Sequence, residues 1–172
     1  MLIDFDSVFK KMITTERISS VNIEGCNECI NEFINTLLKY KRKKIYLEGS
    51  GLASIDLSKE KVDGCSNPDK LQLNEYIAEI GSYIEKAEKM LSYISSKYLN
   101  DDEIKFLQSI LINKNSRNNY EVQNHVSHST LSKISQSCVY KLSDGLGLMI
   151  EKNDNVVEKI QYMKSKYFGY GG

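Results

Sequence analysis

Proline is nearly absent from this chain, with one in 172 residues. Because an interior proline costs a helix about 3 kcal/mol, its scarcity favours a mostly helical protein. No apolar run approaches the roughly 20 residues that a membrane-spanning helix requires. The first residues lack the basic start and apolar centre of a signal peptide, since Asp4 and Asp6 interrupt them. We therefore expect an all-α, cytoplasmic protein that has no membrane partner.

Residue patterns that support catalysis are also missing. The chain has two histidines. Its sequence contains no phosphate-binding glycine loop, no nucleophile paired with a histidine base and no pair of carboxylates in a pattern typical of a cleft. We predict that the protein is not an enzyme and needs no cofactor.

Four cysteines at irregular positions do not form the framework of a disulfide-rich domain. Cys26 and Cys29 have the spacing of a zinc knuckle or of a redox pair. His125 and His128 would be the remaining zinc ligands, but their distance in the sequence argues against this. The segment before Cys26 is also too short for the strand that precedes a redox pair. We interpret Cys26 and Cys29 as unpaired thiols, and Cys138 as a small core residue.

The net charge is zero, with 23 basic and 23 acidic residues, which argues against nucleic-acid binding by bulk electrostatics. The charges are nevertheless unevenly distributed, because residues 105–150 contain five basic and two acidic residues. A second basic cluster spans Lys39 to Lys44. We interpret it as the solvated end of a helix, and leave open whether it contacts nucleic acid.

Apolar residues at helical spacing predict amphipathic helices over residues 2–13 and 27–44. Glycines and the single proline, Pro68, then predict a loop over 45–70. The longest regular element follows at 71–99, where apolar residues alternate steps of four and three, as along the a/d seam of a coiled coil. The partner of this seam is either the same helix of a second subunit, giving a homodimer, or the helix at 27–44. The seam consists of Leu73, Ile77, Ile80, Ile84, Ala87, Leu91, Ile94 and Tyr98.

The remaining residues, 100–172, predict a separate C-terminal domain. Asn100 to Glu103 provide an N-cap and an acidic first turn for a new helix. A last helix is predicted from Val156 to Tyr167 by its apolar spacing. The organisation is therefore a helical N-terminal half (1–70), a long heptad-patterned central helix (71–99) and this domain.

Within the C-terminal domain lies the pattern of a helix-turn-helix. A short helix is expected at about 120–125, and Ser127 or Ser129 can cap the helix that follows. That helix has one apolar stripe, formed by Leu131, Ile134, Cys138, Leu142 and Leu146. The N-terminal half of such a helix enters the major groove of DNA. The outward residues that we predict to contact DNA are Ser127, His128, Ser129, Thr130, Ser132, Lys133 and Gln136.

The order of a long helix, an acidic cap, a Leu-rich helix, a polar turn, a short helix and the segments Val126–Ile134 and Leu142–Gly147 resembles region 4 of bacterial sigma factors. It is more similar to phage regulators of the ArpU and RinA type, over about residues 71–148. This resemblance implies a sequence-specific binder of double-stranded DNA that activates late or packaging genes of a phage or prophage with host RNA polymerase. It assigns DNA recognition to the outward residues named above.

The predicted recognition helix is poor in arginine and lysine, which usually contact phosphates and guanines. Affinity must then come from flanking basic residues or from the avidity of a dimer. Two alternatives stay open. One is a phage small terminase subunit, which also joins a helix-turn-helix to an oligomerising helical region. The other is a non-enzymatic helical interaction module, an inhibitor or adaptor that binds a protein along the seam. The flanking candidates are Lys105, Lys114, Arg117 and Lys141.

Overall fold

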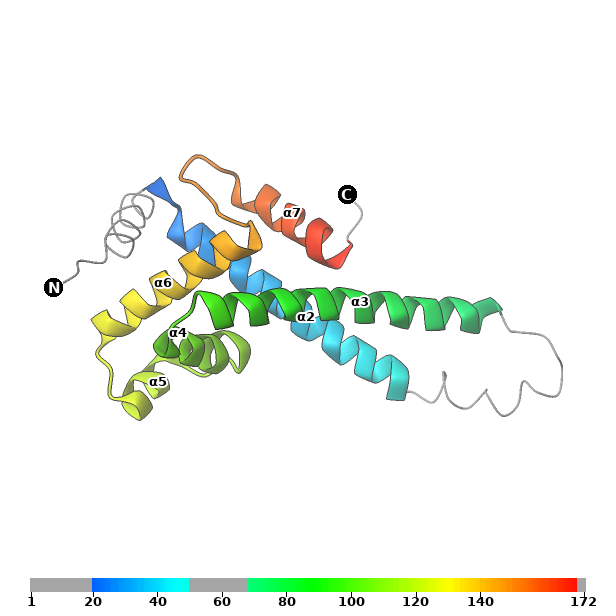
Figure 1. Cartoon of the computed structure of the whole chain (residues 1–172), viewed down its shortest axis with the longest axis horizontal. Helices are drawn as coiled ribbons and strands as arrows, with labels where there is room; N and C mark the ends of the chain where they lie inside the picture. Colours follow the sequence, from blue (N-terminus) through cyan, green and yellow to red (C-terminus); the bar gives the residue numbers. More distant parts are fainter. Residues whose placement is uncertain (1–19, 50–67, 170–172) are drawn as a thin grey trace.

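The computed structural model describes residues 20–49 and 68–169 (Figure 1). Within these ranges the chain forms helices and no strand, apart from an isolated bridge between Val21 and Glu151. The predicted all-α fold is confirmed. None of the helices in the described ranges is long and apolar enough to cross a membrane. The helices are α2 (Ile23–Gly49), α3 (Pro68–Lys97), α4 (Asp101–Phe106), the π-helix η2 (Leu107–Ile112), α5 (Arg117–Asn124), α6 (His128–Leu146) and α7 (Val156–Phe168).

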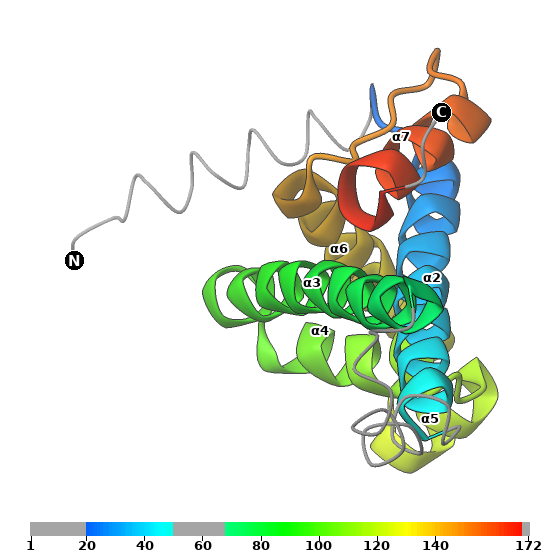
Figure 2. The same cartoon turned by 90° about the vertical axis from the view of Figure 1, so that its right-hand side faces the viewer.

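The hydrophobic core lies where α2 meets α3, α6 and α7 (Figures 1 and 2). Phe33 of α2 is completely buried, and its ring packs edge-on against Tyr167 and beside Phe168 of α7, with centroids 5.2 and 5.5 Å apart. Buried residues from all three predicted regions of the chain contribute to this one core. The N-terminal part of the described chain and the C-terminal domain are therefore packed together.

The seam of α3 faces the protein's own chain. The seam residues from Ile80 to Ile94 are buried, and α3 contacts α2, α6 and α7. The seam residues at the two ends are more exposed to solvent: Leu73 and Ile77 are half-buried, and Tyr98 is 55% exposed. Of the two partners considered above, the chain's own helix is the one that the structure contains. The buried part of the seam is thus not accessible to a second subunit.

The packing of α2 on α3 differs from the coiled coil that the heptad spacing predicted, because the two helices cross each other (Figures 1 and 2). A stripe of residues three and four apart is also what any helix needs to pack one face on a globular core, so the spacing alone does not select supercoiling. Small residues allow close crossings. Ala87 is completely buried, and a Cβ added to Gly145 of α6 would lie 2.7 Å from Ile94 of α3.

The segment predicted as a loop, 45–70, is helical at both of its ends. Helix α2 continues to Gly49, and α3 already begins at Pro68. The last turns of α2 were not predicted because their apolar residues do not continue the buried stripe. Ile45 and Tyr46 are 68% and 73% exposed. Proline is compatible with the first position of a helix, where its missing N–H has no intrahelical partner. Residues 50–67, and the helix predicted over 2–13, lie outside the described residues.

The C-terminal end of α6 is held firmly. Gly147 adopts a left-handed conformation (φ 69°), and the amides of Gly147 and Leu148 donate to the carbonyls of Asp144 and Ser143, as in a Schellman motif. The buried Tyr167 hydroxyl donates to the Leu146 carbonyl over 2.6 Å. Helix α7 thereby fixes the end of α6.

Candidate nucleic-acid interface

Helices α5 and α6 are joined as in a helix-turn-helix. Ser116 caps α5, and the helix ends at His125, whose left-handed conformation (φ 53°) reverses the chain. Ser127 then caps α6 by accepting a hydrogen bond from the Thr130 amide. Residues 125–127 are thus the whole turn, a length typical of this motif. The first helix begins three residues before the predicted start, and Tyr120, 2% exposed, anchors it in the core.

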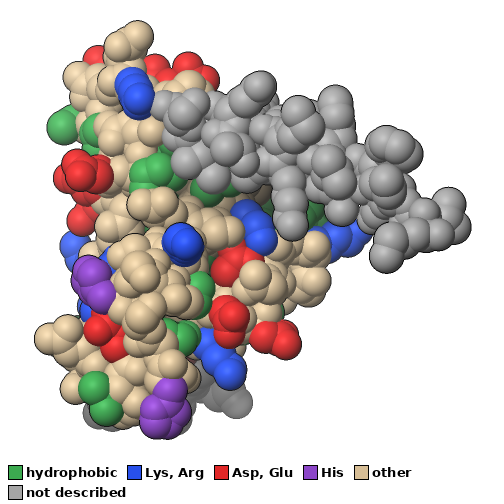
Figure 3. All heavy atoms as spheres, turned by 90° about the vertical axis from the view of Figure 1, so that its left-hand side faces the viewer, with side chains coloured by type: hydrophobic (Ala, Val, Ile, Leu, Met, Phe, Trp, Pro, Cys, Tyr) green, Lys and Arg blue, Asp and Glu red, His purple; other side chains and the backbone are tan. Residues whose placement is uncertain are grey.

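The two faces of α6 separate as the sequence predicted. Leu131, Cys138 and Leu142 are completely buried, and Ile134 is half-buried. Figure 3 views the end of the molecule where α5 and the start of α6 lie, and both histidine side chains are visible there. Ser132 is half-buried. The remaining predicted recognition residues are all exposed: Ser127, His128, Ser129, Thr130, Lys133 and Gln136.

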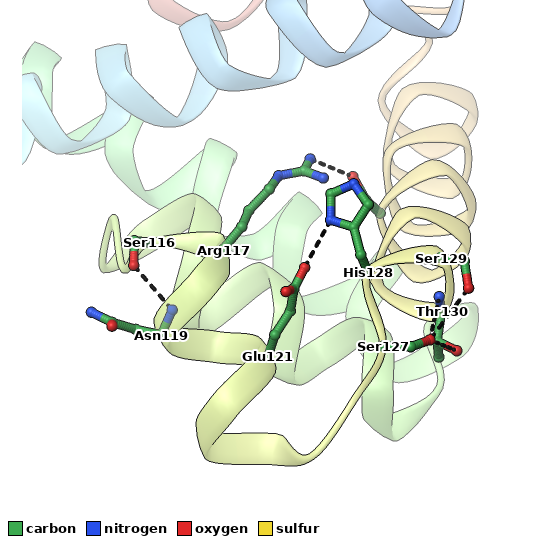
Figure 4. Close-up of polar contacts among 9 residues, drawn as sticks. Ser116, Arg117, Asn119, Glu121, Ser127, His128, Ser129 and Thr130 are labelled. Atoms are coloured by element: carbon green, nitrogen blue, oxygen red, sulfur yellow. Dashed lines mark hydrogen bonds and ion pairs between the residues drawn. The ribbon is translucent and has the colours of Figure 1, made fainter.

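Hydrogen bonds fix several of these side chains at the turn (Figure 4). The Ser127 hydroxyl donates to the Thr130 hydroxyl over 2.8 Å and lies 3.3 Å from that of Ser129. His128 Nδ1 lies 3.0 Å from a carboxylate oxygen of Glu121 on α5. The start of α6 is therefore tied to the first helix of the motif.

Arg117 joins the same two helices. It is the first residue of α5, and its Nη2 donates to the Ser135 hydroxyl on α6 over 3.1 Å (Figure 4). Lys114, another of the basic residues predicted to flank the recognition residues, is exposed. It precedes α5 and has a left-handed backbone conformation. Arg117 thus lies beside α6, and Lys114 lies before the start of α5.

Lys141, a predicted DNA contact, forms an ion pair within the protein. Its ammonium group lies 2.7 Å from a carboxylate oxygen of Glu103, whose side chain is 1% exposed. The other Glu103 oxygen accepts from the Ser137 hydroxyl over 2.9 Å. The lysine therefore compensates a buried charge, and its predicted contact with DNA stays a prediction.

The sequence indicated only the local part of this arrangement. Glu103 and Asn100 form a capping box at the predicted start of α4, with each side chain accepting from the other's backbone amide. The contact with Lys141 lies 38 residues further along the chain. Glu103 therefore connects the start of α4 to the middle of α6.

The cysteine pair is part of the core. Cys26 and Cys29 are completely buried free thiols, and the Ile150 amide donates to Cys26 Sγ over 3.3 Å. Burial, with a smaller effect of Cys26, raises the pKa of Cys29 to about 11. Across the described ranges, no three His, Cys, Asp or Glu side chains are grouped so as to hold a metal ion. The ligand set considered for zinc is thus not assembled, because His125 and His128 lie at the turn before α6.

Cys138 is also buried, as predicted. Its thiol lies 3.6 Å from the Glu103 carbonyl, and burial raises its pKa to about 12.

The charge at this end of the molecule is mixed. In Figure 3 basic and acidic side chains alternate over the visible surface. The Lys39–Lys44 cluster lies toward the opposite end of α2 (Figure 1). There Lys41 pairs with Glu88 at 2.6 Å, and the Lys43 ammonium lies 4.9 Å from the Tyr76 ring centre. The cluster is therefore not at the end of the helix itself, since α2 continues to Gly49, and part of the cluster contacts side chains of α3.

Comparison of the chain with protein-family models, with curated proteins and with solved structures gives no match in any of the three.

Proposed function

We propose that α5, the turn and α6 form a helix-turn-helix that binds double-stranded DNA sequence-specifically. The observation that carries the proposal is the exposed N-terminal half of α6, which follows a capped three-residue turn and stands on a buried apolar stripe. A helix supported in this way can enter the major groove without disturbing the core.

The exposed groups can serve both parts of DNA recognition. Ser129, Lys133 and Gln136 offer a hydroxyl, an amine and an amide, which are groups that hydrogen-bond base edges in the major groove. The N-terminus of α6 and the basic Arg117 and Lys114 favour phosphate groups. In this proposal the protein regulates transcription in the cytoplasm of a bacterial host, as the resemblance to phage regulators implies, and recruits RNA polymerase.

The test is a selection from a pool of randomised DNA duplexes, followed by fluorescence anisotropy of the enriched duplex at several salt concentrations. We expect saturable binding that weakens with salt. Lys133→Ala should weaken it several-fold, because a hydrogen bond to a base edge is lost.

The matched control is Lys89→Ala, which removes the same charge from an exposed position on α3. This variant should bind like the wild type. Failure to enrich or bind any duplex at low salt would refute the proposal.

A second candidate is the protein-interaction module. It is favoured by the exposed apolar residues near the end of α2 and the start of α3, namely Ile45, Tyr46, Leu71 and Tyr76. Exposed apolar residues of this kind can form a partner's binding surface. A protein that binds no duplex, but loses a protein partner on Tyr46→Ser, would support this candidate.

A further inference from the structure

A groove with mixed polar and apolar lining runs along one flank of α6, between that helix and the start of α2, where Ile23 and Val139 form its apolar part. It has a volume of about 170 Å³. Arg117 enters it from α5, held by its hydrogen bond to Ser135. Glu24 and Asn27 line it from α2, and Ser132 and Gln136 line it from α6.

The groove and the proposed recognition face share residues. Ser132 and Gln136 belong to both, so a duplex in contact with Gln136 must pass beside the groove. An α-helix with its side chains is about 10–12 Å across, and the major groove is about 12 Å wide. A helix therefore fills the major groove of the DNA. The flanks of the helix then lie against the phosphate backbones that border the major groove.

Of the five polar side chains that line the groove besides Ser135, four suit a phosphate and one does not. Arg117 supplies up to five N–H donors, and within the described residues the structure gives it no carboxylate partner. The amides of Asn27 and Gln136 and the Ser132 hydroxyl add donors. The exposed Glu24 carboxylate is the exception, because it repels an anion.

We propose that this groove seats a backbone phosphate of the bound duplex, so that the first turn of α2 is part of the DNA interface. Arg117 and Asn27 hold the phosphate, and Glu24 opposes it and lowers the affinity. This inference rests on the proposed function, and it extends the interface beyond the helix-turn-helix to a segment some 90 residues earlier in the chain.

The test uses the same anisotropy measurement on the full chain. Glu24→Gln should tighten binding roughly two- to fivefold at low salt, because one repulsion across a few ångströms is removed. Asn27→Ala should weaken binding by a similar factor. The control is Glu75→Gln, which makes the same charge change at an exposed site of α3 and should change binding less than twofold. Thermal unfolding of each variant checks that folding is retained.

A second measurement locates the phosphate. Duplexes that each carry one neutral methylphosphonate are compared for wild type and Glu24→Gln. At one backbone position the gain from Glu24→Gln should disappear, since no charge is left to repel.

The outcomes separate the two proposals. If the wild type binds and Lys133→Ala weakens it, while Glu24→Gln and Asn27→Ala behave like Glu75→Gln, the groove inference is overturned and the proposed function stands. If the gain from Glu24→Gln is the same on every substituted duplex, the inference is overturned as well. If no duplex binds, both fall.

Discussion

The two halves of α6 have opposite environments. The C-terminal half is enclosed: Leu142, Ser143 and Leu146 are buried, and Glu103 of α4 and Tyr167 of α7 both bond to it. The N-terminal half has one completely buried residue, Leu131, and otherwise presents mostly polar side chains to solvent. This difference shows how a helix can be placed rigidly without covering the face that it offers to a partner.

Mutations in the enclosed C-terminal half of α6, the anchored half, should lower the free energy of unfolding most. Among them Lys141→Met should have the largest effect. Removing the ammonium leaves the Glu103 carboxylate buried without its counter-charge, which costs about 3 kcal/mol. Urea unfolding, followed by circular dichroism, measures the loss. Lys133→Met, on the exposed half, should change the free energy of unfolding by less than about 0.5 kcal/mol.

This pair of variants also tests whether Lys141 acts as a structural ion pair or as a DNA contact. If Lys141→Met unfolds like the wild type but binds duplex DNA more weakly, the residue is a DNA contact and our structural assignment is wrong.

The contact between α6 and α3 should give the next largest effect. Gly145→Ala would place a methyl group 2.7 Å from two carbon atoms of Ile94, so overpacking should cost about 2 kcal/mol. Gly49→Ala is the control, because no atom lies within 4 Å of the added carbon at the end of α2. Thermal unfolding of both variants should show a lower midpoint for Gly145→Ala alone. Equal midpoints would mean that α3 and α6 are less closely packed than the structure has them.

The features that were predictable from sequence are local ones. The periodicity of Leu131, Cys138 and Leu142 located the buried stripe of α6, and Asn100 marked the start of α4. The start of α6 was narrowed to two candidate caps, of which Ser127 is the one that the structure contains. These signals depend on neighbours within one or two turns of helix. These features can therefore be predicted from the amino-acid sequence alone.

The features that were not predictable depend on contacts between distant segments. Nothing near Lys141 indicates that Glu103 will lie beside it, and nothing near Asn27 indicates a groove shared with Gln136. The heptad spacing of α3 is equally compatible with a supercoil and with a crossing. The choice depends on close approaches such as that of Gly145 to Ile94, which only the assembled core defines.

The smallest effect is expected at the N-terminus of α6, where it distinguishes two serines that lie two residues apart. Ser127 accepts from the Thr130 amide and caps the helix, so Ser127→Ala should cost about 1 kcal/mol. Ser129→Ala removes a similar hydroxyl that caps nothing, and its cost in unfolding free energy should stay below about 0.5 kcal/mol. Under the proposed function, Ser129→Ala nevertheless weakens DNA binding, because its hydroxyl faces the duplex. Equal unfolding free energies for the two variants would mean that the cap does not hold the turn, and that the exposed half of α6 depends on its anchored half alone.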